Sequence, residues 1–291
     1  MPRRGDRPPG AAAKVTIRAI HGGSDPRGRI EKCDDLVAVE EPLEIRLFAE
    51  AGGSRRSHRY AVTMRSPGHD AELACGLLLA EGIVSRPLDI WRTGRCEDAD
   101  AEGVDNTMEV HLAPGVGFDP EDHRRSGYTS SSCGVCGKES IEQLKAMGGA
   151  APVSDLVIAP AVIRALPEVL RSAQSVFAET GGLHACGLFS GTGELELLRE
   201  DVGRHNALDK VIGRLLLDDR LPASDSILLV SGRAGFELVH KAMAGGIAVM
   251  LAVGAPSSLA IETAEAFGMT LSGFVRDGRF NVYTGGHRIR S

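Results

Sequence analysis

The sequence predicts an α/β protein with a smaller N-terminal α+β domain and a C-terminal three-layer α/β/α domain. Two observations predict this class. Segments of strand length and helix-like segments take turns after residue 138, and the strand segments there are apolar without alternation. Such runs are typical of strands covered by helices on both faces, and a strand–helix–strand series forms a largely parallel sheet. We therefore divide the chain into a flexible tail (1–30), an N-terminal domain (31–125), a mobile loop (126–138) and the α/β/α domain (139–291).

The N-terminal part predicts short strands around one helix. Its first residues, MPRRGDRPPGAAAK, are rich in Pro, Gly and Arg, which indicates a flexible tail. A helix is expected within 67–83, where Leu73, Leu77 and Leu78 fall at helical spacing. Apolar and polar residues alternate, as in half-buried strands, at Lys14–Ile20, Leu43–Phe48, Arg59–Met64 and Thr107–Pro114.

The C-terminal part predicts a regular succession of strands and helices. Ala161–Glu179 has helical spacing, interrupted or kinked at Pro167. Further helices are expected at 139–147, 206–218, 236–244 and 257–269. The expected strands are His184–Phe189, Ser226–Gly232, Ile247–Val253 and Thr270–Val275.

Composition excludes several function classes. The chain has 291 residues and a formal net charge of −6, which argues against nucleic-acid binding. It contains no stretch of the roughly 18 to 20 apolar residues that cross a bilayer, and no secretory signal is visible at its start. We expect a cytoplasmic protein that binds neither membrane nor nucleic acid.

Three glycine-containing turns predict a site for an anionic ligand. In open α/β sheets, ligands bind beyond the carboxyl ends of the strands, where helix N-termini offer backbone N–H groups. Arg233, Arg276 and Arg279 add forked donors suited to phosphate. The turns are Val230–Gly235, Ala252–Ser258 and Phe274–Phe280.

The segment Arg199–Lys210 concentrates polar groups at a strand-to-helix junction. Asp201 is a candidate helix cap, and an Asp/Arg pair here could be purely structural. His205 could act as a base or contact a ligand, although a structural hydrogen-bonding role is the better interpretation.

Six cysteines include one recognisable pair, Cys133 and Cys136, in a polar, Gly-rich segment. Cys75 and Cys186 lie in apolar stretches and are expected to be small core residues. A structural zinc site would need a second ligand pair, for which only His184 and Cys186 are available. Zinc deaminase chemistry is disfavoured because Cys186 stands where that signature has Glu.

Two uses of the cysteine pair stay open: redox exchange and sulfur transfer through a persulfide. Thioredoxin-like pairs follow a buried strand, whereas the residues before Cys133 are Ser, Thr and Gly. The nearby cations that can lower a thiol pKa are His123, Arg124, Arg125 and Lys138. Composition alone does not choose between the two.

Six motifs in order resemble the FdhD family of formate dehydrogenase accessory sulfurtransferases, from about Asp35 to Tyr283. They are SSCGVCGKESIE, TGGLHA, EDVGRHNALDKVIG, SGRAGFELVHKA, APSSLAIETA and GFVRDGRFNVYT. The resemblance implies a sulfurtransferase that takes sulfur from a cysteine desulfurase and passes it to the molybdenum cofactor required by formate dehydrogenase. That cofactor, a bis(molybdopterin guanine dinucleotide), would be bound as cargo, with no metal held by the protein itself.

The resemblance also assigns residues. Cys133 matches the persulfide-bearing cysteine and Cys136 its partner. The cofactor-binding segment matches Phe274, Val275, Arg276, Asp277, Gly278 and Arg279. It further implies a cytidine-deaminase-type fold for the C-terminal domain and a homodimer. A non-catalytic chaperone that only delivers the cofactor is the alternative, and full maturation activity without both loop cysteines would favour it.

Overall fold

The computed structural model describes residues 10–22, 29–51, 54–96, 106–119, 141–142 and 151–290. The two cysteines of the predicted mobile loop, Cys133 and Cys136, lie outside the described residues, as do the predicted domain boundaries at 125 and 139. Within these ranges, no helix has both the length and the apolar character needed to span a bilayer.

A four-stranded sheet in the order β4-β3-β6-β5 forms the N-terminal unit. Its strands are β3 (Glu41–Ala51), β4 (Ser54–Arg65), β5 (Ile90–Arg95) and β6 (Thr107–Leu112). A short 3₁₀ helix, η1 (Pro87–Asp89), precedes β5. Alternate side chains of β3 are at most 1% exposed at Leu43, Ile45 and Leu47, and they join the core around α1 (Asp70–Ala80). The period of two in the sequence therefore predicted the buried face of this sheet.

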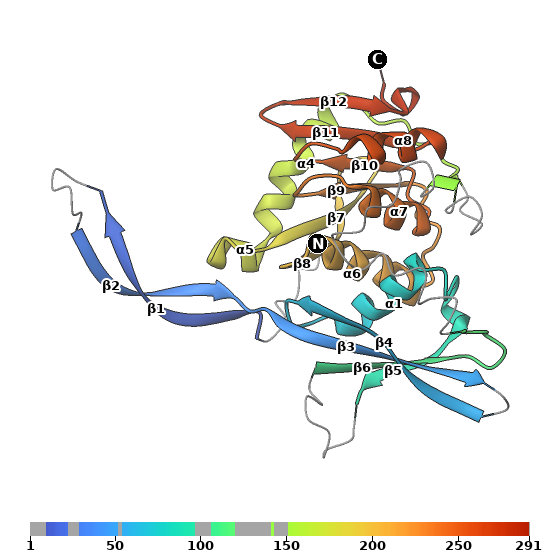
Figure 1. Ribbon diagram of the computed structural model, residues 1–291. Coiled ribbons are helices and arrows are strands. Elements are labelled where there is room, and N and C mark those ends of the chain that lie inside the picture. Colours follow the sequence, from blue (N-terminus) through green and yellow to red (C-terminus); the bar gives the residue numbers. More distant parts are fainter. Residues whose placement is uncertain are drawn as a thin grey trace.

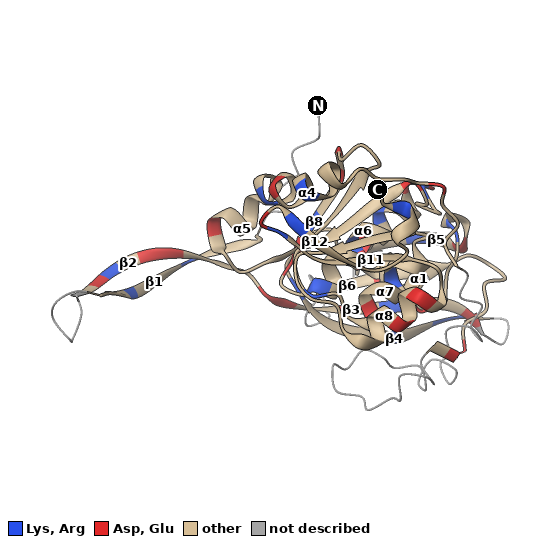
Figure 2. Cartoon of the chain, turned by 90° about the horizontal axis from the view of Figure 1, so that it is seen from above, with Lys and Arg blue, Asp and Glu red and all other residues tan. Residues whose placement is uncertain are grey.

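A separate two-stranded ribbon projects from the body (Figures 1 and 2). It pairs β1 (Ala12–His21) with β2 (Arg29–Ala38) in antiparallel register. At its base, Ala11 is buried in a small cluster with Val176 and Leu183. β1 confirms the strand predicted at Lys14–Ile20, so the predicted flexible tail of residues 1–30 does not hold for 12–21, where the sequence alternates like a strand.

The C-terminal unit contains a six-stranded sheet in the order β12-β11-β10-β9-β7-β8 (Figure 1). Its strands are β7 (His184–Ser190), β8 (Leu195–Asp201), β9 (Ser226–Val230), β10 (Val249–Ala252), β11 (Thr270–Arg276) and β12 (Arg279–Thr284). β9, β10 and β11 are parallel, but β7 pairs antiparallel with both β8 and β9, and β12 pairs antiparallel with β11. The expectation of a largely parallel sheet is wrong at these strands, because short turns without a crossover helix force antiparallel pairing.

Helices cover both faces of this sheet. Leu228 and Val230 of β9 join the core with α6, α7 and α8, whereas Ile227 and Leu229 pack on α4. The helices are α4 (Pro160–Ala173), α5 (Ser175–Thr180), α6 (Arg204–Leu217), α7 (Phe236–Ala244) and α8 (Ser258–Ala266), with a terminal 3₁₀ turn η3 (Gly286–Arg288). The more specific likeness to cytidine deaminases stays a prediction.

Helix α4 is not interrupted at Pro167, which lies within it. The chain leaves the helical conformation at Gln174, where φ is −75° and ψ is 88°, and resumes it as α5. A proline removes one hydrogen bond of a helix, which neighbouring packing can compensate. Here Leu166 and Leu170 on either side of Pro167 are buried against the sheet.

The two units join through a close crossing of α1 and α6. A Cβ atom on Gly213 would lie 1.8 Å from the Glu72 carbonyl oxygen, and one on Gly76 would lie 1.9 Å from that of Asp209. No side chain fits at either position, so glycine allows the two backbones to touch. The same hydrophobic core extends from β3 through α1 and α6 to α7.

Candidate functional site

The carboxyl ends of four strands meet at one edge of the C-terminal sheet. β9, β10 and β11 are parallel, and β8 shares their direction because both β8 and β9 run antiparallel to β7. We call this edge the rim and define it by residues 231–235, 253–257 and 274–279 together with His184 and Arg204. All three turns that the sequence predicted to converge lie here.

Backbone hydrogen bonds connect the three turns in a row. The Gly254 N–H donates to the Gly232 carbonyl oxygen at 2.9 Å, and the Phe274 N–H donates to the Gly254 carbonyl oxygen at 3.0 Å. Ala234 and Ala255 add a further bond of 3.1 Å between the first two turns. The rim is therefore a continuous hydrogen-bonded surface and not three independent loops.

Close approach requires glycine at Gly254 of the rim and at Gly273 directly before it. A Cβ atom on Gly254 would lie 2.9 Å from the Gly232 carbonyl oxygen, and one on Gly273 would lie 2.7 Å from the Pro256 ring. The turns therefore pack directly against one another at these two positions, with no room for a side chain between them. Gly-rich turns at strand ends commonly let a phosphate approach the backbone in this way.

The predicted cofactor segment forms the turn between β11 and β12. Phe274, Asp277 and Gly278 all have positive φ, at 54°, 54° and 73°. Non-glycine residues adopt this conformation rarely, and such strain is concentrated at functional sites. The turn projects beyond the sheet, with Arg276 paired across from Arg279.

One residue of the segment cannot present its side chain to a ligand. Val275 is 0% exposed and belongs to the core between the sheet and α4. It can offer only its backbone, whereas the side chains of Arg276, Asp277 and Arg279 are exposed. The Arg276 guanidinium lies 5.7 Å from the centre of the Phe274 ring.

The arginines of the rim have few carboxylate partners among the described residues. Among the described residues, Arg204, Arg233 and Arg279 have no carboxylate within ion-pair distance, and Arg276 has only an approach of 3.8 Å to the exposed Asp277. In a chain of net charge −6 this concentration of unpaired cations favours an anionic ligand. Guanidinium groups suit phosphate because they donate two parallel hydrogen bonds.

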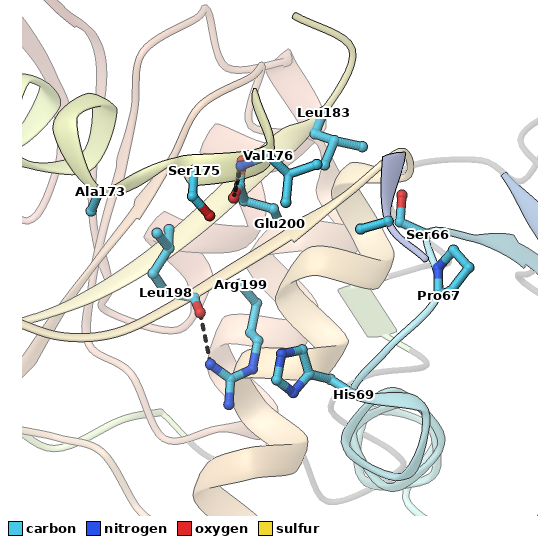
Figure 3. Close-up of a pocket in the computed structure, with 11 residues that line it drawn as sticks. Ser66, Pro67, His69, Ala173, Ser175, Val176, Leu183, Leu198, Arg199 and Glu200 are labelled. Atoms are coloured by element: carbon cyan, nitrogen blue, oxygen red, sulfur yellow. Dashed lines mark hydrogen bonds between the residues drawn. The ribbon is translucent and has the colours of Figure 1, made fainter. Parts of the chain in front are cut away.

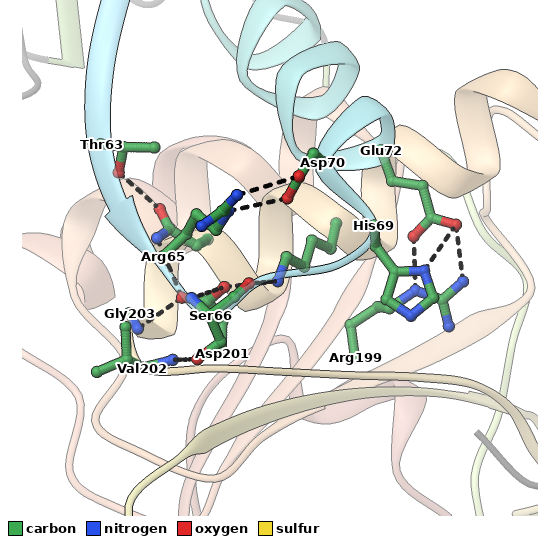
Figure 4. Close-up of polar contacts among 12 residues, drawn as sticks. Thr63, Arg65, Ser66, His69, Asp70, Glu72, Arg199, Asp201, Val202 and Gly203 are labelled. Carbon is green, nitrogen blue, oxygen red and sulfur yellow. Dashed lines mark hydrogen bonds and ion pairs between the residues drawn. The ribbon is translucent and has the colours of Figure 1, made fainter. Parts of the chain in front are cut away.

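In the neighbouring segment Arg199–Lys210, most polar side chains form hydrogen bonds within the protein. Asp201 is 0% exposed and pairs with Lys210 at 2.6 Å, while Lys210 also donates to the Ser66 carbonyl oxygen (Figure 4). Asn206 donates to the Met64 carbonyl oxygen at 2.7 Å. These bonds attach the connection between β4 and α1 to α6, so most of the polar cluster is structural.

Asp201 does not cap α6 as predicted. The helix begins after Gly203, and the Asp201 carboxylate accepts instead from the Gly203 and Ser66 N–H groups and from Asn206 and Lys210. The carboxylate is buried between the two units, which places it behind the helix start. Its hydrogen-bonding capacity is therefore directed to the junction and away from the rim.

One further ion pair strengthens the same junction, and another connects α6 to α7 beside it. Arg199 donates two bonds, of 2.6 and 2.8 Å, to Glu72 of α1 (Figure 4). Burial by itself raises the pKa of Glu72, but hydrogen bonds from Arg199 and His69 outweigh it and hold the pKa at about 2. Lys241 pairs with Asp209 at 2.6 Å between α7 and α6. We call these contacts and the Asp201–Lys210 pair the junction network.

His205 has a partner within the protein. Its Nε2 lies 3.2 Å from Glu237 Oε2, at the start of α7. Burial, with Arg204 and Lys241 nearby, lowers the pKa of His205 to about 4. The imidazole is thus neutral at physiological pH, and the pairing supports the structural interpretation.

A small pocket lies beside β8, at the base of the ribbon (Figure 3). It contains none of the predicted site residues. Its polar groups are occupied: Glu200 accepts from the Val176 and Phe177 N–H groups, and Arg199 is held by Glu72 and the Leu198 carbonyl oxygen. The lining residues are Ala11, Ser66, Pro67, His69, Ala173, Ser175, Val176, Leu183, Leu198, Arg199 and Glu200. The pocket is a weaker ligand site than the rim because few donors remain available.

Two of the described cysteines, Cys75 and Cys186, are poor nucleophiles. Cys75 and Cys186 are at most 1% exposed, which confirms them as core residues, and burial raises the pKa of both thiols, that of Cys75 to about 12. Cys96 is also buried, and Cys33 lies half-buried on the ribbon. Across the described ranges, no group of three or more His, Cys, Asp or Glu side chains is placed to hold a metal ion. The predicted catalytic cysteines Cys133 and Cys136 lie outside these ranges.

Comparison with known proteins identifies the family. The model of the FdhD/NarQ family matches residues 38–290. The chain belongs to the FdhD/NarQ family. It is 48% identical over 258 residues to the sulfur carrier protein FdhD of Mycolicibacterium paratuberculosis, covering 88% of this chain and 92% of that protein. It is 44% identical over 267 residues to the sulfur carrier protein FdhD of Streptomyces coelicolor, covering 90% and 92%.

A solved structure extends the comparison to the fold. The crystal structure of a protein described as a formate dehydrogenase accessory protein, from Desulfotalea psychrophila, matches with a TM-score of 0.70 and 25% identity. The match covers 95% of this chain and 99% of that chain. The mixed α/β architecture is therefore shared within the FdhD/NarQ family.

The sequence analysis considered His184 only as a possible zinc ligand and Arg204 only within the polar segment Arg199–Lys210, and it placed neither residue on the rim. His184 and Arg204 start β7 and α6, and the strand register places His184 opposite Asp201. Both side chains face Gly232: a Cβ atom there would lie 3.4 Å from His184 Nδ1 and 3.9 Å from Arg204 Cδ. Their convergence at the rim was missed because it depends on an antiparallel pairing that the sequence analysis did not predict.

Proposed function

We propose that this FdhD/NarQ family member is a sulfurtransferase that serves formate dehydrogenase. It accepts sulfur from a cysteine desulfurase on Cys133 and delivers it to a bis(molybdopterin guanine dinucleotide) cofactor bound as cargo on the rim. The carrying observation is the 48% identity to a protein named as a sulfur carrier, over 88% of the chain. The hydrogen-bonded rim with unpaired arginines supports the phosphate-bearing cargo.

The loading step is a thiol exchange. The Cys133 thiolate attacks the outer sulfur of the desulfurase persulfide, the sulfur–sulfur bond breaks, and the desulfurase cysteine leaves as its thiolate. Cys133 then carries the outer sulfur as a persulfide. Two of the described cysteines cannot take this role, because the thiols of Cys75 and Cys186 are buried and protonated at neutral pH.

The release step uses Cys136. Its thiolate attacks the inner sulfur of the Cys133 persulfide, a disulfide forms between the two cysteines, and the outer sulfur leaves as hydrosulfide for the molybdenum of the cargo. The two electrons come from the cysteine pair, and a cellular thiol reductant restores it. We place this chemistry in the cytoplasm and expect a homodimer, as the family resemblance suggests.

Intact-mass spectrometry tests the loading step. The protein is incubated with a cysteine desulfurase and cysteine, and the sulfur gained is counted for Cys133→Ser, Cys136→Ser and the control Cys33→Ser. We expect wild type, Cys136→Ser and Cys33→Ser to gain one sulfur and Cys133→Ser to gain none. Equal gain by Cys133→Ser would remove its proposed role, and full formate dehydrogenase maturation without both loop cysteines would favour the chaperone alternative.

A further inference from the structure

Arg204 has a buried donor without an acceptor among the described residues. It is the first residue of α6, and its Nε is inaccessible to solvent and has no hydrogen-bond partner in the described part of the chain. No carboxylate among the described residues lies within ion-pair distance of its guanidinium. A buried donor left unsatisfied is unfavourable, because it has lost its hydrogen bonds to water. Such a group in a native protein calls for an explanation, and a ligand acceptor is the simplest one.

His184 lies at the same point of the rim. A Cβ atom placed on Gly232 would come within 3.4 Å of His184 Nδ1 and 3.9 Å of Arg204 Cδ, so both side chains lie beside this glycine. The carboxylate closest to them in strand register, Asp201, is occupied by Ser66, Gly203, Asn206 and Lys210. The imidazole and the guanidinium therefore converge without a protein anion between them.

This cluster is continuous with the predicted cofactor segment. The backbone row Gly232–Gly254–Phe274 joins them through bonds of 2.9 and 3.0 Å. β7, which His184 begins, is three strand spacings from β11, or about 14 Å along the sheet edge. Unpaired arginines thus stand at both ends of one backbone surface.

We infer that Arg204 and His184 form a second anion site on the rim, which binds a phosphate group of the ligand whose other end lies on Phe274–Arg279. The inference rests on the proposed function and goes beyond it, since neither residue belongs to the predicted cofactor segment. The guanidinium supplies paired donors to the phosphate, and the Gly232 turn leaves the room that a side chain would fill. An extended ligand with phosphates at separate points satisfies both ends.

The electrostatics of His184 fit this role. Burial and the neighbouring Arg204 lower the pKa of His184, and Asp201 opposes them. The ring is neutral at pH 7 and can share a proton with a phosphate oxygen. The charged or titratable neighbours that act on this ring or respond to it are Arg204, Asp201 and His205.

Titration calorimetry with inorganic diphosphate and with GDP tests the site on the full chain. The variants are Arg204→Gln, Arg279→Ala and the control Arg220→Gln, whose arginine is paired with Glu196 at the far end of α6. We expect Arg204→Gln to weaken the binding of both ligands by tenfold or more and Arg220→Gln to leave their affinities unchanged. Removal of a charge-assisted hydrogen bond has effects of this size.

The outcomes separate the inference from the proposed function. If Arg279→Ala weakens GDP binding while Arg204→Gln binds both ligands with the affinity of wild type, the inferred second site is wrong and the rim proposal stands. If wild type binds neither ligand at millimolar concentration, both the cargo assignment and the second site fail. Should Arg204→Gln not fold, Arg204→Lys and His184→Gln replace it, and unchanged binding in both overturns the inference. Sulfur loading of Cys133 should be normal in every variant.

Discussion

The rim and the junction network use the same residue types in opposite ways. At the junction, Asp201 meets Lys210 at 2.6 Å and Glu72 meets Arg199 at 2.6 Å, and each pair is nearly inaccessible to solvent. At the rim, Arg204 and Arg279 have no such partner among the described residues. Charges that a protein satisfies internally hold its units together, whereas cations left unsatisfied over an open backbone are available to a ligand. Inside one sequence motif, EDVGRHNALDKVIG, this difference separates the internally paired Asp201 and Lys210 from Arg204, which is unpaired in the described part of the chain.

The largest loss of stability is expected when the junction network is broken. Lys210→Met removes the partner of Asp201, which is 0% exposed, and leaves a buried carboxylate uncompensated. We expect the free energy of unfolding to fall by about 3–5 kcal/mol, measured by urea denaturation. The double variant Asp201→Asn/Lys210→Met should recover part of this loss, and equal stability of Lys210→Met and wild type would show that the pair does not hold the units together.

Acid should weaken the junction through Glu72. Its pKa is about 2 in the folded protein against 4.5 for an unperturbed glutamate, so the pair stabilises the fold above pH 4.5. That stability, about 2–3 kcal/mol, is lost as the pH falls from 4.5 towards 2. Glu72→Gln should show a shallower loss of unfolding free energy over this window. Parallel pH profiles for the two proteins would contradict the assignment.

The crossing of α1 and α6 gives an intermediate effect. Gly213→Ala would place a Cβ atom 1.8 Å from the Glu72 carbonyl oxygen, so the helices must separate. We expect a loss of about 1–3 kcal/mol, with a lower midpoint of thermal unfolding. The control is Gly94→Ala on β5, where a Cβ atom has no described neighbour within 4 Å. A similar midpoint for both variants would mean that the crossing is not tight in solution.

The smallest effect on stability is expected at the rim. Arg233 is exposed and has no ion-pair partner among the described residues. Arg233→Gln should change the free energy of unfolding by less than about 0.5 kcal/mol while weakening GDP binding in calorimetry. A large loss of stability without an effect on GDP binding would mean that Arg233 is structural, as the junction residues are, and would contradict the contrast between the two regions.

The sequence predicted those parts of the fold that local pattern determines. β9, α7, β10, α8 and β11 follow from apolar runs and helical spacing, and β3 follows from its alternation. β2 was missed because its sequence, RIEKCDDLVA, does not alternate, and the antiparallel direction of the predicted strand β7 was missed because direction depends on connection length.

The candidate site was predictable to a similar degree. The three turns were found because glycine and strand ends are visible in sequence. The convergence of His184 and Arg204, and the diversion of Asp201 and Lys210 to the junction, depend on tertiary register, which no local pattern encodes. Val275 was assigned from the resemblance alone, and its burial shows that a motif position need not present its side chain to the ligand.

A crystal structure of the protein with GDP would test the central claim most directly. The account predicts the nucleotide along the rim, with phosphate oxygens within about 3 Å of the Arg204 guanidinium or of the backbone of the Phe274–Arg279 turn. A nucleotide bound instead in the pocket beside His69 and Glu200, with the rim empty, would contradict it.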